Sequence, residues 1–285
     1  MAAPSAAAAA AFTSLEAALQ LAADPARAAQ KASYFKHVLP FLGVMTPAVE
    51  AAVACHVLSA RLSTPEVMAV AASCLAHRHH ELKQAGVFAL HRARRALLAP
   101  AAAPAALAMV AAAFHARHVC DWATSDGLST RVLAPLVRAH PATGLPLLEA
   151  WSRDGAFPWK QRAAAVAFVP LLRDAGAPHA AAALRVCDAV VTAQSRFPQL
   201  GAGWCVRELG AQRPAEALAF LRARLPLIWP EGLRYALEKA PAGERQALMG
   251  EHRAARAAAA AAAAAEGGGG GKERRGGGKK RGREA

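Results

Sequence analysis

Short breaks containing Pro, Gly or Asp divide the chain into helical stretches. The spacing of these breaks constrains the fold more than any other feature of the sequence. The stretches between breaks are roughly ten to twenty residues long, which is the usual length of helices in globular proteins. Almost no stretch shows the alternating pattern or the β-branched runs that indicate strands. The chain is therefore predicted to be all-α. The clearest breaks are Ala99-Pro100, His140-Pro141, Asp174-Ala175-Gly176 and Arg213-Pro214.

Two helix starts are marked by capping residues. Thr46 is followed by Pro47, and a hydroxyl side chain before a proline is a strong start signal because Pro fits the first helical turn. Ser63 is followed three residues later by Glu66, the spacing at which the two side chains can satisfy each other's backbone N–H groups. Both positions are predicted to begin helices.

The helices recur in pairs with a period of roughly 35 to 45 residues, which predicts an α-solenoid of HEAT-like antiparallel helix pairs. A compact helical bundle is the alternative.

Ser14 is expected to cap the first helix. These features predict a low-complexity N-terminus at 1–13, a HEAT-like domain at 14–256, and an Ala/Gly-rich, basic, disordered tail at 257–285.

The chain is strongly basic, with a formal net charge of +14. From Glu266 onward it carries seven Lys or Arg and three Glu, so about +10 belongs to the remainder. The body is therefore basic as well as the tail. Such a charge indicates a polyanionic partner, either nucleic acid or an anionic membrane surface.

The five cysteines stand singly without CxxC spacing, which indicates reduced thiols in an intracellular protein. The long apolar runs are rich in alanine, which is too weakly hydrophobic to anchor a span, so no membrane segment is expected. Residues 1–11 lack the basic region of a leader. The basic tail could serve as a nuclear address, so we expect a nuclear location, with an organelle as the alternative.

Trp122 and Asp126 stand four residues apart, so on a helix they share one face. Later helical segments contribute Arg162 and Trp204, and we expect all four side chains to converge on one concave surface. An ionised carboxylate in an apolar neighbourhood is costly unless it is paired, and Arg162 is the obvious partner for Asp126. Two alternatives stay open: each Trp could be a core residue, and the ion pair could be purely structural.

Cys74, His77, His79 and His80 have helical spacing that invites a metal site, but no second cluster completes four ligands. An exposed turn between two helices explains these histidines better. The sequence also lacks a Gly-rich phosphate loop, a G-x-S-x-G elbow and an H-E-x-x-H motif. We therefore expect no metal and no cofactor.

Five motifs in order resemble those of the AlkD-like DNA alkylation repair enzymes, which are HEAT-repeat alkylpurine DNA glycosylases. The resemblance covers about residues 14 to 250. Its motifs in this chain are Tyr34-Phe35-Lys36 after Asp24-Pro25, Pro40-Phe41-Leu42-Gly43-Val44 with Thr46-Pro47, Trp122 with Asp126, Trp159-Lys160-Gln161-Arg162-Ala163-Ala164, and Gly203-Trp204-Cys205-Val206-Arg207-Glu208.

The resemblance implies a DNA repair glycosylase that hydrolyses the N-glycosidic bond of cationic alkylated purines, 3-methyladenine and 7-methylguanine, in double-stranded DNA. It implies Asp126 as the catalytic carboxylate and Arg162 as a DNA contact facing the groove. Trp122 and Trp204 would then line the sugar of the damaged nucleotide. We expect a monomer with further DNA contacts from Tyr34, Lys36, Lys160 and Arg207.

Other functions stay open beside the glycosylase. A HEAT-like module without catalysis could recognise distorted or branched DNA, which would also explain the basic body. A protein scaffold could use the tail for localisation alone. The presence of Asp126 with both Trp122 and Trp204 favours the enzyme, because a non-catalytic relative would be expected to lose them. Arg207 directly precedes Glu208, and a structural ion pair is the favoured interpretation of these neighbours.

Overall fold

The computed structural model describes residues 4–267, and every regular element among them is helical, so the predicted all-α class is confirmed. Two π-helical segments, Ala54–Leu58 and Ser129–Leu133, interrupt the α-helices. The α-helices are α1 (Ala6–Leu21), α2 (Pro25–Tyr34), α3 (Thr46–Val53), α4 (Thr64–Ala76), α5 (His80–Arg92), α6 (Arg94–Leu97), α7 (Ala103–His115), α8 (Trp122–Leu128), α9 (Ala134–Ala139), α10 (Pro141–Ser152), α11 (Pro158–Val166), α12 (Phe168–Leu171), α13 (Ala180–Val190), α14 (Arg196–Gln212), α15 (Pro214–Arg224), α16 (Pro230–Ala236) and α17 (Ala242–Gly267).

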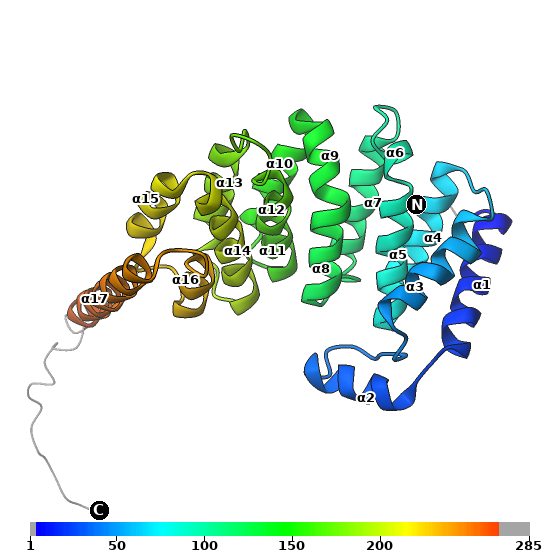
Figure 1. The fold of residues 1–285 in the computed structure, drawn as a ribbon, viewed down its shortest axis with the longest axis horizontal. Helices are drawn as coiled ribbons and strands as arrows, with labels where there is room; N and C mark the ends of the chain where they lie inside the picture. The colour runs from blue at the N-terminus through cyan, green and yellow to red at the C-terminus, as the bar shows by residue number, and fades with distance from the viewer. Residues whose placement is uncertain (1–3, 268–285) are drawn as a thin grey trace, which may run out of the picture.

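Helices close in sequence are also neighbours in space. The helices α3, α5, α8, α11, α14 and α16 form one row in which each helix contacts the next. A second row contains α1, α4, α7, α10 and α13, in which α1 contacts α4, α4 contacts α7, and α10 contacts α13. Figure 1 shows the result as an arch with α2 at one end and α17 at the other. Helices therefore pack on their neighbours along the chain, and the assignment of this stack as an α-solenoid stays a prediction.

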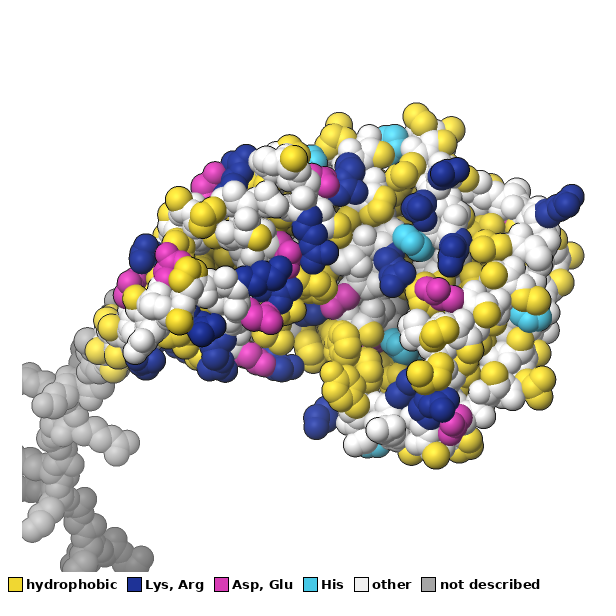
Figure 2. Space-filling view, viewed as in Figure 1, with side chains coloured by type: hydrophobic (Ala, Val, Ile, Leu, Met, Phe, Trp, Pro, Cys, Tyr) yellow, Lys and Arg dark blue, Asp and Glu magenta, His cyan; other side chains and the backbone are white. Residues whose placement is uncertain are grey.

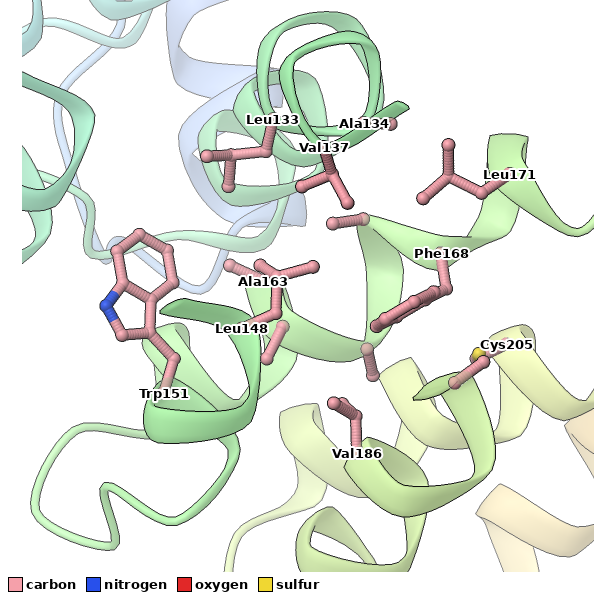
Figure 3. Close-up of a cluster of buried hydrophobic side chains, with 14 of the residues drawn as sticks. Leu133, Ala134, Val137, Leu148, Trp151, Ala163, Phe168, Leu171, Val186 and Cys205 are labelled. Atoms are coloured by element: carbon pink, nitrogen blue, oxygen red, sulfur yellow. The ribbon is translucent and has the colours of Figure 1, made fainter. Parts of the chain in front are cut away.

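The core between the two rows is built largely from alanine and medium-sized aliphatic side chains. Ala163, Ala164 and Ala165 on α11 are fully buried, and such small side chains let neighbouring helices approach closely. Larger groups fill the spaces that remain, including Phe168 and Trp151 (Figure 3). The Trp151 ring lies 4.8 Å from that of Phe114. The high alanine content therefore reflects close helix packing, with few bulky side chains in the core.

The first helix begins earlier than the sequence predicted. It starts at Ala6, where the Ser5 hydroxyl accepts a hydrogen bond from the backbone N–H of Ala8 at 3.2 Å. The expected cap at Ser14 is therefore wrong, because that residue lies inside the helix. Ala8 and Ala11 are buried against the N-terminal core, so much of the segment assigned to a low-complexity N-terminus is part of the fold.

Of the two later helix starts, the predicted cap at Ser63 is confirmed and the predicted cap at Thr46 is wrong. Ser63 and Glu66 form the predicted capping box, with the carboxylate of Glu66 accepting from the Ser63 backbone N–H at 2.9 Å. At the start of α3, Met45 is the capping residue and Thr46 is already helical, without a side-chain capping bond. The proline in the first turn therefore marks this start more reliably than the hydroxyl.

The alanine tract after Arg256 continues α17 as far as Gly267, so residues 257–267 are helical and not part of a disordered tail. Alanine has the highest helix propensity, which favours this extension without packing on one face.

Residues 1–3 and 268–285, including the predicted basic tail, lie outside the described residues. In the described part of the chain, no single helix is long and apolar enough to cross a membrane. Helices α1 and α2 together have the required length and composition, but the chain bends by 99° between them.

The connection from α2 to α3 is held to the solenoid by a buried carboxylate. Glu81 on α5 is completely buried and accepts from the backbone N–H groups of Leu42 and Gly43 at 2.8 and 3.0 Å. Gly43 has φ +83°, and a Cβ there would lie 2.1 Å from the carbonyl oxygen of Asp24. Helix α2 buries none of its own residues, so these polar contacts fix its position at the end of the arch.

Candidate active site

A cleft of about 310 Å³ opens between α3, α5, α8 and α14. Trp122 and Asp126 on α8 line it together with Trp204 on α14, which confirms that these three predicted residues converge. In the space-filling view the molecule is hollowed between α2 and the α14–α16 end, and Lys and Arg side chains lie on both sides (Figure 2). The cleft therefore combines aromatic walls and a carboxylate within a basic surface.

Asp126 is bound by Arg162, which reaches it from α11 with two parallel hydrogen bonds. Arg162 Nε donates to Asp126 Oδ1 at 2.8 Å, and Arg162 Nη2 donates to Asp126 Oδ2 at 2.7 Å. The third nitrogen, Nη1, donates to the carbonyl oxygen of Phe197 at 2.9 Å. The side chains of Arg162 and Asp126 are only 7% and 15% exposed. This planar two-point contact fixes the direction of the carboxylate.

The orientation of Arg162 differs from the one that the family resemblance implied. All three guanidinium nitrogens donate to protein oxygens, and the side chain is buried. Arg162 therefore does not lie free on the groove face, and its first task is to hold Asp126. Burial raises the pKa of the Asp126 carboxyl above its ordinary value, while the hydrogen bonds from Arg162 oppose this shift.

Trp122 is covered on one face by an aromatic residue that sequence reasoning did not assign to the site. The ring of Phe35 lies parallel to it, with ring centroids 5.0 Å apart and an interplanar angle of 5°. Tyr34 meets Trp122 edge-on at 6.3 Å and is 71% exposed, so it stands at the rim of the cleft. The neighbouring Tyr-Phe pair after Asp24-Pro25 was the available signal, but only the folded loop brings it to Trp122.

Trp204 is supported from behind by a cation and a second ring. The guanidinium of Arg207 lies 5.9 Å from the Trp204 ring and 4.8 Å from the ring of Tyr235. The buried Nε1 of Trp204 has no hydrogen-bond partner among the described residues. Arg207 is itself paired with Glu208 and Glu238, which confirms the structural interpretation of the Arg207–Glu208 neighbours. Its contact with DNA stays a prediction.

Helices α14 and α16 approach each other so closely at Gly203 that a side chain does not fit. A Cβ on Gly203 would lie 2.5 Å from the carbonyl oxygen of Gly232. We expect Gly203→Ala to lower the free energy of unfolding by about 1–3 kcal/mol, because the backbone must move to relieve the overlap. Gly210→Ala on the same helix is the control, since its Cβ would be 3.6 Å from its nearest neighbour. Equal stability of the two variants in urea unfolding would contradict this packing argument.

Glu208 lies beneath Trp204 in a cluster of three cations. It is 3% exposed, and it accepts from Arg173 at 3.0 Å, from Arg207 at 2.9 Å and from Lys239 at 3.2 Å. Burial alone would raise the pKa of Glu208, but these hydrogen bonds outweigh burial and lower the pKa from 4.5 to about 2. Because the folded-state pKa is depressed, the stabilisation is complete above pH 4.5 and is lost as the pH falls toward 2.

Glu208→Gln is therefore expected to cost about 1–3 kcal/mol of stability at neutral pH, after allowance for the exposure of two of the cations. The difference between wild type and variant should shrink as the pH is lowered from 4.5 toward 2, measured by urea unfolding at each pH. Glu231→Gln is the control, because its pair with Arg196 is 40–52% exposed and should contribute little. A difference that is constant across this pH range would contradict the assignment.

The other residues near the cleft that could contact DNA differ in their exposure and in whether they are already paired. Lys36 is exposed on the connection that follows α2. Lys160 donates to Asp154 at 2.8 Å and is 15% exposed, so its ammonium is already paired. Arg131, which the sequence analysis did not single out, lines the cleft and is exposed. The contact of any of these residues with DNA stays a prediction.

The histidine-rich segment before α5 is only partly the exposed turn that was expected. His80 is 7% exposed and lines the cleft, with its ring 5.0 Å from that of Phe41. The interpretation of His80 as an exposed turn residue is therefore wrong. Among the residues that the structure describes, no group of three His, Cys, Asp or Glu could hold a metal ion.

The fold and the cleft define an all-α stacked-helix protein with a buried carboxylate and aromatic rings on a basic surface. The family of DNA alkylation repair enzymes matches residues 15–240, and the chain therefore belongs to that family, whose role is in DNA repair and implies binding to DNA.

A solved structure described as "Predicted DNA alkylation repair enzyme from Enterococcus faecalis" has a similar fold, with a TM-score of 0.65 at 16% sequence identity. The match covers 77% of this chain and 97% of that one. No curated protein is significantly similar in sequence.

Proposed function

We propose that this protein is a monofunctional DNA glycosylase that hydrolyses the N-glycosidic bond of cationic alkylated purines in duplex DNA. The observation that carries the proposal is the position of Asp126, buried beside two Trp side chains in the cleft and held by Arg162. The proposal also includes HEAT-like helix pairs, a place in base excision repair, a monomeric state and a nuclear location.

The chemistry of the substrate explains why so few groups would suffice. Alkylation at N3 of adenine or N7 of guanine leaves the base positively charged, so it can depart without being protonated. The remaining demand is to stabilise the positive charge that develops on the deoxyribose as the bond breaks. A carboxylate fixed beside the sugar meets this demand in a site with little water. Asp126 suits this role, because Arg162 holds both of its oxygens in one direction.

The aromatic residues would add to the same effect. The faces of Trp122 and Trp204 can each stabilise a positive sugar by a cation–π interaction of about 1–2 kcal/mol when water is excluded. Exposed cations around the cleft, such as Lys36 and Arg131, would hold the phosphates on either side. Binding of this kind weakens steeply as the salt concentration rises.

The deciding experiment is release of free 7-methylguanine or 3-methyladenine from methylated duplex DNA by the purified protein. The expected result is release that depends on protein concentration and leaves abasic sites without strand cleavage. Binding to the same duplex without any base release would favour the alternative, a HEAT-like module that recognises distorted DNA. Absence of both binding and release would contradict both functions.

A further inference from the structure

The cleft contains two side chains that can accept a proton. Among the described residues that line it, these are Asp126 and His80, whereas the other polar groups are Thr, Gln, Trp and Arg side chains. Hydrolysis by water releases a proton, and a side chain that accepts it during attack would accelerate the step. The contacts of each group decide between them.

Asp126 is poorly suited to take the proton. Each of its carboxylate oxygens already accepts a hydrogen bond from Arg162, at 2.8 and 2.7 Å. A proton placed on either oxygen would break one of these bonds and leave the guanidinium without its counter-charge in a buried site. Asp126 can therefore stabilise positive charge well, but it is a weak base while Arg162 holds it.

His80 has the opposite environment. Its Nδ1 is buried without a hydrogen-bond partner among the described residues. It lies 3.8 Å from Asp121 Oδ1, too far for a hydrogen bond but close enough for electrostatic attraction, and Asp121 is 2% exposed. The ring is wedged between Phe35 and Phe41, at 5.4 and 5.0 Å, and the His80 backbone N–H donates to the carbonyl of Pro40 at 3.0 Å. These contacts hold the imidazole with Nδ1 directed toward a carboxylate.

A carboxylate beside Nδ1 favours the tautomer that carries the proton on that nitrogen. The other nitrogen, Nε2, then carries the lone pair of an imidazole that lines the cleft. We propose that His80, oriented by Asp121, is the general base of the cleft and accepts the proton of the attacking water through Nε2. This inference rests on the proposed glycosylase function and adds to it the group that receives the proton.

The proposed step balances in atoms and charge. The water oxygen forms a bond to C1′ of the deoxyribose while the C1′–N bond to the alkylated base breaks. The electron pair of that bond goes to the base, which loses its positive charge on departure. The proton of the water moves to Nε2 and leaves an imidazolium ion next to Asp121. Asp126 stabilises the sugar during the step and keeps its bonds to Arg162.

The pH dependence follows from the groups around His80. Burial lowers its pKa below the ordinary value of 6.5; Asp121 and Glu81 oppose this shift, whereas Lys31 and Lys83 reinforce it. The imidazole is therefore neutral at pH 7 and able to accept a proton. Activity should fall as the pH drops below 6.5 through this lowered pKa, and fall again where Asp126 becomes protonated.

The test measures single-turnover base release from methylated duplex DNA across pH for wild type, His80→Gln and Asp121→Asn. General-base catalysis typically contributes 10²–10⁴-fold, so His80→Gln should slow release by about 100-fold or more and remove one of the two limbs from the acid side of the pH profile. Asp121→Asn preserves the capping bond to the N–H of Thr124, at 2.8 Å in wild type, but no longer favours the required tautomer. It should slow release while the protein stays folded and binds DNA with wild-type affinity.

His252→Gln is the matched control, because His252 is a buried histidine on α17 that hydrogen-bonds the carbonyl of Ile228. It should leave both the rate and the pH profile unchanged. Wild-type rate and pH profile in a folded His80→Gln variant would overturn the inference while the proposed function stands. A loss of DNA affinity with an unchanged rate of release would also overturn it, since His80 would then be a DNA contact. Absence of release by wild type itself would reject the proposed function.

Discussion

Asp126→Asn is expected to abolish base release, with a loss of at least about 100-fold, or roughly 2–3 kcal/mol of barrier. The amide keeps the size of the carboxylate but cannot provide the negative charge that stabilises the developing positive sugar. The affinity for methylated duplex DNA should stay close to wild type, because the proposed binding depends on cations that contact phosphates and not on this carboxylate. Single-turnover release and equilibrium DNA binding measured on the same preparations separate these two effects.

A suitable control for this variant is Asp154→Asn. Asp154 also pairs with a cation, Lys160 at 2.8 Å, but it is not part of the cleft. It should therefore leave base release near the wild-type rate. Near-normal turnover by Asp126→Asn would remove the carboxylate from the mechanism, whatever the control shows. A loss in both variants would point to a general effect of charge on DNA binding.

Arg162→Ala is expected to destabilise the fold by about 3–5 kcal/mol, because it leaves the buried Asp126 carboxylate without its partner. It also leaves the carbonyl of Phe197 without the donor that it has in the wild-type protein. The salt dependence of DNA binding should stay unchanged, since a buried guanidinium does not neutralise a phosphate. Urea unfolding and the slope of affinity against salt concentration measure the two properties independently.

The chain offers a closely matched control for this prediction. Arg138 contacts Asp174 through the same two-point geometry, at 2.9 and 3.0 Å, but the two side chains are 44% and 38% exposed. Arg138→Ala should therefore cost no more than about 1 kcal/mol. A stable Arg162→Ala protein whose salt slope drops by about one unit would show instead that Arg162 grips the DNA.

A double variant sharpens the interpretation. If the cost of Arg162→Ala comes from an uncompensated charge, then removing that charge as well should restore part of the stability. Asp126→Asn combined with Arg162→Ala is thus expected to be more stable than Arg162→Ala alone. Additive losses in the two single variants would indicate that Arg162 contributes mainly by packing.

The helical fold could be predicted from the sequence because its signals are local. Proline in a first helical turn, a Ser63–Glu66 capping box and short Pro or Gly breaks act within a few residues of each other. The errors also had local causes. The first helix extends back to Ala6 because small alanine side chains, Ala8 and Ala11, continue its buried face. The last helix continues to Gly267 because alanine favours a helix even without a buried face.

The site was predictable where its members lie on one helix or in a recognisable motif. Trp122 and Asp126 share a face of α8 because they are four residues apart, and Trp204 was found through its motif. The direction of Arg162 could not be predicted in this way. Whether a guanidinium meets a carboxylate or a solvent-filled groove depends on the burial of both groups, which several helices decide together.

The sequence alone therefore determined the fold class, the basic character of the chain and three of the residues that line the cleft. The tertiary structure alone decided that Phe35 stacks on Trp122 and that His80 lies beside Asp121, across 41 positions of sequence. These contacts join residues whose separation has no helical period. Phe35 lies on the connection after α2, which Glu81 binds through the backbone of Leu42 and Gly43. Local propensity acts over a few residues, whereas the packing of several helices sets which distant side chains meet.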